Sequence, residues 1–389
     1  MVPFFILFLL VSFGSVSAVL FTPALPTIQA FFKVSAGEAQ LAVTSYLAGY
    51  ALGQLPYGPL ANGIGRKKTL YVGISLAILG SLFCALSSFV GSFWVLVLAR
   101  FIQALGACVG LKMSFTIVLD VYDSLTATRM ISKFLAAFAI MPGVAIAIGG
   151  SLVQWMNWES CFYFLALFGA VMLVFVSRLP ETAPSIDIRS LDFLSILEGY
   201  RLKLKNKRLL LSGILVGCGT AVIYVFAARA PFIGINLIGM RPDTFGFFNF
   251  IPSLGMLIGS FLSTWLVKRY SPFPLLRAGI WICFVLALGM LGLFIFFGPS
   301  IWSLFFPIAL MYAADALVFT TGSSLGLTSA KNKSNASAIF NFLNIGMALV
   351  GVLVSEWVYP EVAVVLPIAA IVLFLAVILL SSSKAFISE

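Results

Sequence analysis

Four charged residues interrupt long apolar stretches of this chain and are the first candidates for chemistry: Arg100, Lys112, Arg229 and Asp315. If those stretches lie in lipid, each charge opposes insertion by about 2.5–3.5 kcal/mol, so its presence indicates a function or a specific partner. Asp315 is the only acid that we place near the middle of a stretch, and a desolvated carboxyl without a partner favours its protonated form. The sequence therefore predicts that Asp315 carries a proton, with Arg100 as a second coupling residue.

The same residues also allow structural interpretations. A salt bridge from Asp315 to Arg229 or Arg100 would join two parts of the chain, and it becomes a switch if protonation breaks it. Arg100 alone could bind backbone carbonyls of neighbouring helices, although we favour a role in binding. Arg229, equally open to a role in binding, and Lys112 could extend their charged ends to the lipid–water interface.

Three cations against one carboxylate favour an anionic ligand in these stretches. Arginine offers a planar fork for carboxylate or phosphate, so we expect Arg100 and Arg229 to suit an anionic or polycarboxylate molecule, such as a siderophore, better than a lipophilic cation. Two helix faces carry further candidate binding residues, for which hydrogen bonding between helices is the alternative: Tyr46, Tyr50 and Gln54 on one, Asn341 and Asn344 on the other.

The elements that must position these residues are membrane-spanning helices. Hydrophobic residues make up 61% of the 389 residues and charged residues only 9%, which excludes an ordinary soluble domain. A helix needs roughly 20 apolar residues to cross the hydrocarbon. The sequence predicts an all-α fold with twelve such spans: 3–31, 38–61, 69–90, 92–119, 130–154, 158–178, 209–236, 244–267, 274–297, 301–328, 337–358 and 361–383.

The distribution of charge predicts how these spans are grouped and oriented. Residues 179–208 form the only long polar stretch, with a short surface helix, and separate two pseudo-symmetric six-helix bundles at 1–178 and 209–389. Most of the 23 Lys and Arg residues fall on one side of the spans, whereas Lys33 and Arg241 fall on the other. The positive-inside rule then places both termini in the cytoplasm. Residues 15–18 look like a signal-peptidase site, but no cation precedes the first apolar run, so we expect a transmembrane helix there.

Several ordered motifs carry a resemblance to a known family. They are residues 22–26 (TPALP), 53–59 (GQLPYGP), the glycine–cation loop 58–68 (GPLANGIGRKK), 100–107 (RFIQALGA), and Pro142, Ala145, Gly149 and Gly150 followed by Trp158 and Phe162. In these positions the chain resembles the Bcr/CflA-like drug:proton antiporters of the major facilitator superfamily, most strongly over residues 20–182. The resemblance implies that two bundles rock about a central site.

The resemblance also implies gating residues. The glycine–cation loop, with Gly58, Gly65 and Arg66, would latch the inner gate. The family has an aspartate where Asn62 stands, and Asp120 is the natural substitute partner for Arg66. Pro142, Gly149 and Gly150 would bend the fifth span where the bundles move, although close packing is an equal alternative for the two glycines.

Together these observations predict a proton-coupled secondary transporter that exports a small amphipathic or anionic molecule across the bacterial inner membrane. Uptake of an anionic metabolite or siderophore is the alternative within the fold, and a membrane sensor or scaffold without transport is the alternative outside it. The chain contains no His, and its five Cys are unpaired in spacing, so we expect neither an enzyme, a metal site nor a cofactor. We expect a monomer whose partners are the substrate, protons and the lipid bilayer, and no nucleic acid.

Overall fold

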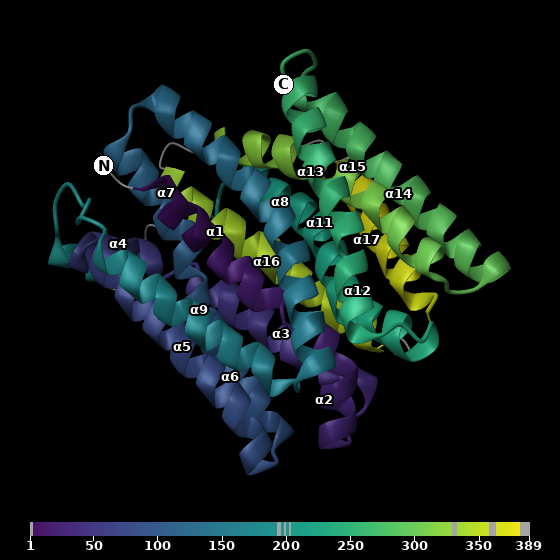
Figure 1. The fold of residues 1–389 in the computed structure, drawn as a ribbon. Coiled ribbons are helices and arrows are strands. Elements are labelled where there is room, and N and C mark those ends of the chain that lie inside the picture. The colour runs from purple at the N-terminus through teal and green to yellow at the C-terminus, as the bar shows by residue number, and fades with distance from the viewer. Residues whose placement is uncertain are drawn as a thin grey trace.

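The computed structural model describes residues 3–192, 196–197, 200–201, 204–328, 333–357 and 363–381. Over these residues the chain is helical throughout its apolar runs and contains no strand. The first half comprises α1 (Phe4–Val19), η1 (Thr22–Ala24), α2 (Leu25–Phe32), α3 (Ala36–Gly53), α4 (Tyr57–Ile64), α5 (Arg66–Val90), α6 (Phe93–Ala107), α7 (Val109–Val121), α8 (Ser124–Trp155) and α9 (Glu159–Ser177) (Figure 1).

The second half follows a linker that contains η2 (Ile188–Leu191). It comprises α11 (Lys207–Pro231), η3 (Phe232–Leu237), α12 (Pro242–Phe248), α13 (Phe250–Leu266), α14 (Pro272–Phe297), α15 (Ile301–Thr328), α16 (Lys333–Trp357) and α17 (Val365–Ser381). The surface helix predicted within 179–208 is only partly described, as η2 and a few helical residues between 196 and 201.

The described helices account for the twelve predicted spans. Ten segments are long and apolar enough to cross a membrane: Phe4–Phe32, Arg66–Val90, Phe93–Val121, Ala136–Trp155, Glu159–Ser177, Lys207–Leu237, Pro242–Leu266, Pro272–Phe297, Ile301–Thr328 and Ala336–Glu356. The other two are α17, a shorter apolar helix, and the α3–α4 segment. Between α3 and α4 the helix is interrupted before Pro56, which cannot donate a backbone hydrogen bond. The all-α fold of twelve helical segments in two halves is confirmed.

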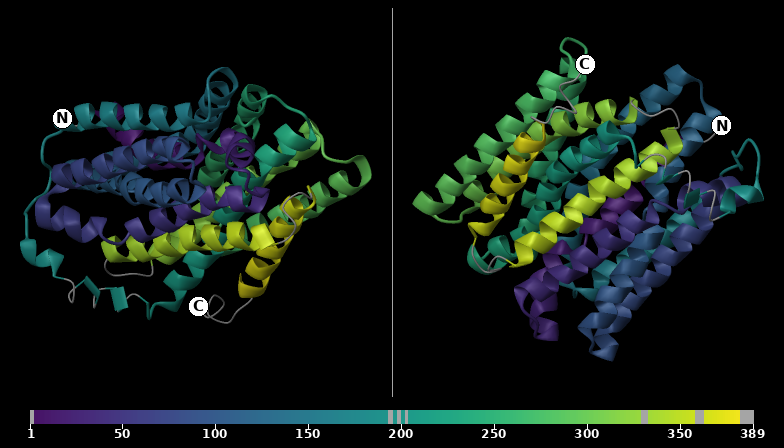
Figure 2. Two further views of the ribbon diagram at one scale, coloured as in Figure 1. Left: turned by 90° about the horizontal axis from the view of Figure 1, so that it is seen from below. Right: turned by 180° about the vertical axis from the view of Figure 1, so that it is seen from behind.

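The two halves meet at two main contacts, one formed by α3 and the other by α8 of the first half. α3 packs against α16, and α8 packs against α12 and α13, so each half contributes to both contacts. Figures 1 and 2 show α16 alongside the purple helices of the first half, from which it is distant in sequence. α1 lies inside the first half against α7 and α8, as expected for a transmembrane helix in a bundle core.

Small residues allow the close approach at α8. A Cβ atom on Gly149 would lie 1.7 Å from the backbone oxygen of Leu20, and one on Gly150 would lie 2.2 Å from that of Pro242. α8 continues through both glycines without a break. The pair therefore fits the close-packing interpretation in this conformation, with Gly149 facing α1 and Gly150 facing the second half.

Candidate functional site

The guanidinium group of Arg100 lies in the core of the first bundle. The residue is 0% exposed. Its Nε donates to the carbonyl of Ala42 at 3.1 Å, Nη1 to that of Ser17 at 2.9 Å, and Nη2 to that of Ala18 at 3.2 Å. Nη1 also donates to the Gln103 side chain. Every nitrogen of the group has an acceptor, so the carbonyl-binding interpretation describes its position.

The sequence around α1 explains why a cation is needed there. Ser17 and Ala18 are in the last turn of α1, where carbonyls lack donors from the helix itself and carry its negative dipole end. A buried arginine supplies several donors and a positive charge at the same point. The rings of Phe21 and Tyr46 lie 4.0 and 4.2 Å from the guanidinium carbon and exclude water from its faces.

Asp315, on α15, is buried in the second bundle with no such partners. It is 4% exposed and packs against α11, where a Cβ atom on Gly219 would lie 1.8 Å from its Oδ1. Within the described residues, no hydrogen bond or ion pair reaches it, and Oδ1 is buried without a partner. The predicted alternative of a salt bridge to Arg229 or Arg100 is therefore wrong in this conformation, because both cations have other partners.

Arg229 interacts with an acid that the sequence analysis overlooked. It is 2% exposed near the end of α11, so it does not extend to the membrane surface. Its electrostatic partner is Glu356 on α16. Glu356 lies inside the predicted span 337–358, so counting the acids in that span would have found it. Glu356 is a second carboxylate beside these cations, so the predicted balance of three cations against one carboxylate is wrong.

Lys112 is also held by the protein. Its Nζ donates to the carbonyl of Gln54 at 2.8 Å, at the break between α3 and α4 that leaves this carbonyl without a helical donor. The same ammonium group lies close to Gly58, where a Cβ atom would be 3.1 Å from it. All three membrane cations thus interact with groups of the chain itself.

The candidate binding residues on α3 and α16 differ in how far their polar groups are satisfied. Tyr46 donates to the Gly14 carbonyl at 2.8 Å and stacks on Tyr50, with ring centroids 6.0 Å apart. In contrast, buried amide atoms of Gln54 and Asn344 have no partner among the described residues. Asn341, on the same helix as Asn344, is half-buried. α3 and α16, which carry these side chains, pack against each other between the halves.

Two tyrosines of the second half extend this group. Tyr224 on α11 interacts electrostatically with Arg100 and Tyr46. Tyr312 on α15 interacts with Tyr224 and with Asp315, and its hydroxyl donates to the Ile223 carbonyl at 3.3 Å. The sequence could have indicated Tyr312, because this residue lies only three positions before Asp315 in the same predicted helix. Tyr224 is thus within electrostatic range of Arg100, and Tyr312 is within electrostatic range of Asp315.

The glycine–cation loop forms the ion pair that the sequence predicts. Arg66 Nε lies 2.9 Å from Asp120 Oδ2, with side-chain exposures of 9% and 14%. Arg66 Nη1 donates to the Ala61 carbonyl at 2.9 Å and to the Asn62 amide oxygen at 3.1 Å. Asn62 thus keeps an acceptor near Arg66, and Asp120 supplies the carboxylate.

A second carboxylate, from the linker, was missed. Glu181 accepts from the backbone N–H of Arg66 at 2.8 Å and of Lys67 at 3.1 Å, at the start of α5. Gly65, with φ +94°, precedes them and has no side chain that could cap the helix. Partial burial raises the pKa of Glu181, but backbone donors of Ala183, Arg66, Lys67 and Thr182 lower it further, and the net pKa is below the ordinary value.

The rest of the linker continues along the same loop. The Asp187 N–H donates to the Asn62 carbonyl at 3.0 Å, and the Ser190 hydroxyl to the Pro59 carbonyl at 3.2 Å. Leu191 packs against Gly63, where a Cβ atom would lie 2.5 Å from it. The linker is therefore bound to the loop at several points.

Comparisons with known proteins agree with this architecture. The sequence model of the Major Facilitator Superfamily matches residues 5–352. The MFS-type transporter YdgK of Bacillus subtilis is 28% identical over 382 residues, 96% of this chain and 92% of that one. Multidrug resistance protein D of Escherichia coli is 27% identical over 320 residues, 82% and 79% of the two chains. A bicyclomycin resistance protein homolog of Haemophilus influenzae is 26% identical over 297 residues, 72% and 74%.

Other comparisons cover different lengths or show the fold alone. A transporter of Rickettsia bellii is 27% identical over 269 residues, and this chain spans 65% of its length. The crystal structure of a D-xylose-proton symporter has a TM-score of 0.74 at 15% identity, covering 96% of both chains. An inward open conformation of the xylose transporter XylE from E. coli has a TM-score of 0.75 at 13% identity. With its matched sequence model, its Bcr/CflA-like relatives and its helical fold, this chain belongs to the major facilitator superfamily of multi-pass membrane transporters.

Proposed function

We propose that the protein is a proton-coupled efflux transporter of a small amphipathic molecule in the bacterial inner membrane, with both termini in the cytoplasm. The printed names of two relatives, a multidrug resistance protein and a bicyclomycin resistance protein homolog, support export. The observation that carries the proposal is Asp315, a buried carboxyl without a partner among the described residues, whereas Arg100, Lys112 and Arg229 all interact with groups of the chain.

Asp315 is the proposed proton carrier. Burial without a partner favours its neutral form, whereas contact with water favours release of the proton. A change between two conformations that differ in this contact would therefore bind and release one proton. Tyr312 is within electrostatic range of Asp315, and Tyr224 is within range of Tyr312 and of Arg100 in the first half, so the two tyrosines are proposed to link protonation to the contact of the halves.

An amphipathic substrate fits the charges better than an anionic one. Arg100 and Lys112 already donate to protein acceptors, and Arg229 interacts with Glu356. An anion would have to displace these partners before it could use the guanidinium or ammonium groups. The amide atoms of Gln54 and Asn344 that have no partner among the described residues offer neutral hydrogen bonds, and Tyr46 and Tyr50 on the same helix as Gln54 offer aromatic surface.

Alternating access assigns separate roles to the other candidate residues. Arg66, Asn62 and Asp120 are proposed to hold the loop between α4 and α5 at the inner gate, with Gly58 and Gly65 allowing its close approach to Lys112 and Glu181. Gly150, which faces the second half, is proposed to lie on the α8 surface on which the halves move, whereas Pro142 and Gly149 are proposed to shape α8 itself. Arg100 is proposed to act as a positioning residue that fixes α1 to α3.

Transport by purified protein in proteoliposomes tests the proposal. With an acidic lumen, an antiporter releases protons outward and accumulates substrate inside; ethidium serves as the lipophilic cation and citrate as the polycarboxylate. We expect gradient-driven ethidium accumulation by the wild type, none by Asp315→Asn, and wild-type accumulation by Asp187→Asn, which removes a carboxylate from the linker. Accumulation of citrate but not ethidium would replace this proposal with transport of anions.

A further inference from the structure

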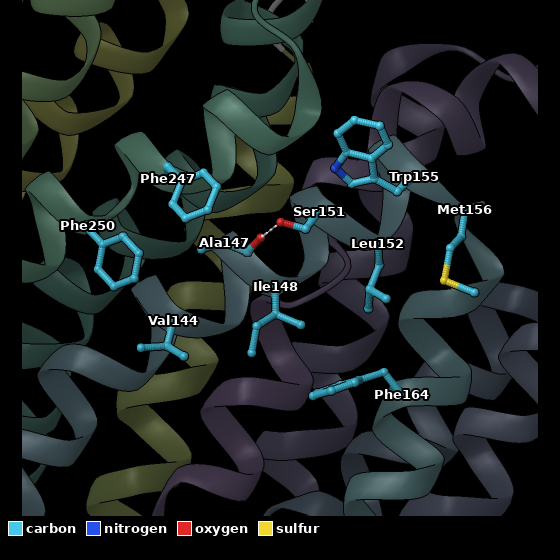
Figure 3. A pocket seen from close by; sticks show the side chains of 10 residues that line it. All are labelled: Val144, Ala147, Ile148, Ser151, Leu152, Trp155, Met156, Phe164, Phe247 and Phe250. Atoms are coloured by element: carbon cyan, nitrogen blue, oxygen red, sulfur yellow. Dashed lines mark hydrogen bonds between the residues drawn. The ribbon is translucent and has the colours of Figure 1, made fainter.

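An apolar cavity opens at one end of the contact between the two halves. It has a volume of about 420 Å³, and its walls come from α8 and α9 of the first half and α12 and α13 of the second (Figure 3). Ile148 and Phe164 line it on one side, and Phe247 and Phe250 on the other. Phe247 is 58% exposed, so this wall also faces the surroundings of the protein.

Apart from the indole N–H of the exposed Trp155 at the mouth, the lining offers no free polar side-chain group. The only hydroxyl in it, that of Ser151, donates to the Ala147 carbonyl of its own helix at 2.9 Å, as Figure 3 shows. A small drug-like ligand is normally oriented by a few polar groups inside its pocket. This cavity lacks them, and it suits a long hydrocarbon chain.

A cation lies at the mouth of the cavity. Arg241 sits over the ring of Trp155, a lining residue that is 74% exposed, with 5.6 Å between the guanidinium carbon and the ring centroid. Its side chain is 57% exposed, and only Nη2 is engaged among the described residues, with Asp243 at 2.7 Å. Exposed tryptophan and arginine side by side are typical of the level of lipid headgroups.

We propose that this cavity binds one anionic glycerophospholipid, with an acyl chain between α8 and α12–α13 and its phosphate at Arg241. A glycerophospholipid matches this arrangement, because its anionic phosphate would lie at Arg241 and its long apolar chain in the cavity. In the predicted topology Arg241 is one of two cations on the outer side, so the lipid comes from the outer leaflet. This inference goes beyond the transport function and depends on no particular substrate.

The lipid would also bias the conformation of the transporter. Both halves form its walls, and beside it the helices are in close contact: a Cβ atom on Gly246 would lie 2.8 Å from the Ile146 oxygen. Movement of one half against the other changes the distance between the walls. The lipid therefore binds the present conformation more tightly than one in which α8 and α12 separate, and it stabilises the present one.

Native mass spectrometry of the full chain in detergent tests the proposal, with phosphatidylglycerol and phosphatidylcholine of identical acyl chains as probes. We expect the wild type to retain one phosphatidylglycerol with about fivefold preference over phosphatidylcholine, the effect of one cation near a headgroup. Arg241→Gln should remove this preference, while Lys33→Gln, which removes the other outer cation, should keep it.

A second pair of variants tests the acyl-chain part of the site. Ile148→Trp fills the cavity and should reduce retention of both lipids, whereas Ile282→Trp, a change on the exposed face of α14, should not. Equal retention of the two lipids by the wild type would overturn the proposal. So would equal behaviour of the two charge variants, or unchanged retention in Ile148→Trp, since each indicates a general lipid shell.

Discussion

Arg100 and Asp315 are buried ionisable residues in the two different bundles, yet their surroundings are opposite. Arg100 has acceptors at each nitrogen and aromatic rings on its faces. Asp315 has a glycine against its carboxylate and no hydrogen bond within the described residues. The first arrangement fixes one charge state and one geometry, whereas the second allows the charge to change. The difference indicates that Arg100 holds its part of the first bundle in one geometry, whereas the carboxyl of Asp315 in the second bundle can gain and lose a proton.

Removing Arg100 should have the largest effect on stability. Arg100→Leu leaves the carbonyls of Ser17, Ala18 and Ala42 buried without donors, and we expect a loss of about 3–5 kcal/mol or failure to fold. Arg100→Lys keeps the charge with fewer donors and should lose about 1.5–3 kcal/mol. Thermal unfolding in detergent measures both. Wild-type stability of Arg100→Leu would show that the comparison assigns Arg100 the wrong role.

Neutralising Asp315 should have little effect on the fold. Asp315→Asn keeps the shape and removes a buried charge without breaking any described hydrogen bond, so we expect stability within about 1 kcal/mol of wild type, or higher. The same thermal measurement checks this. A loss as large as that of Arg100→Leu would mean that Asp315 has a structural partner.

The contribution of the Arg66–Asp120 ion pair to stability should be intermediate, because the pair is mostly buried but lies at the ends of its helices, α5 and α7. A double-mutant cycle with Arg66→Gln and Asp120→Asn should give a coupling of about 1–3 kcal/mol. The cycle for Arg241 and Asp243, whose arginine is 57% exposed, is the matched control and should give about 0.2–1 kcal/mol. Equal couplings would show that burial does not strengthen the pair at the loop.

Glu181 should contribute least, and its effect should depend on pH. Its pKa is lower in the folded protein than in the unfolded chain, so the carboxylate stabilises the folded state above the unfolded pKa, and this contribution is lost as pH falls through the folded pKa. Glu181→Gln should lower stability by about 0.3–1 kcal/mol at neutral pH, as expected for a charge at a helix start.

The difference between wild type and Glu181→Gln should disappear in acid, below the ordinary pKa of a glutamate. Unfolding curves collected at a series of pH values measure that difference. Asp187→Asn, on the same linker, is the control. A difference between wild type and Glu181→Gln that grows as pH falls would contradict the sign of the pKa shift.

The fold could be predicted from the sequence because the length of each apolar run determines a span locally. The Arg66–Asp120 pair was also predictable, since the motif requires a carboxylate and Asn62 cannot supply it. The partners of Arg100 could not be predicted: they are backbone carbonyls, which carry no sequence signal, from segments 58 and 83 positions away.

Two other features needed the three-dimensional arrangement. The role of Glu181 depends on a linker that folds back onto the start of α5, which no local pattern indicates. The partner of Arg229 was also missed: the sequence analysis considered only Asp315 for it, but the packing of α11 on α16 brings Glu356 to Arg229 instead.

The most direct test of proton coupling separates exchange from accumulation in Asp315→Asn proteoliposomes. Exchange of labelled for unlabelled ethidium needs both conformations but no net proton movement, whereas accumulation against a gradient needs the proton. We predict exchange near the wild-type rate together with loss of gradient-driven accumulation. Accumulation equal to wild type in this variant would contradict the account, because the proton would then bind elsewhere.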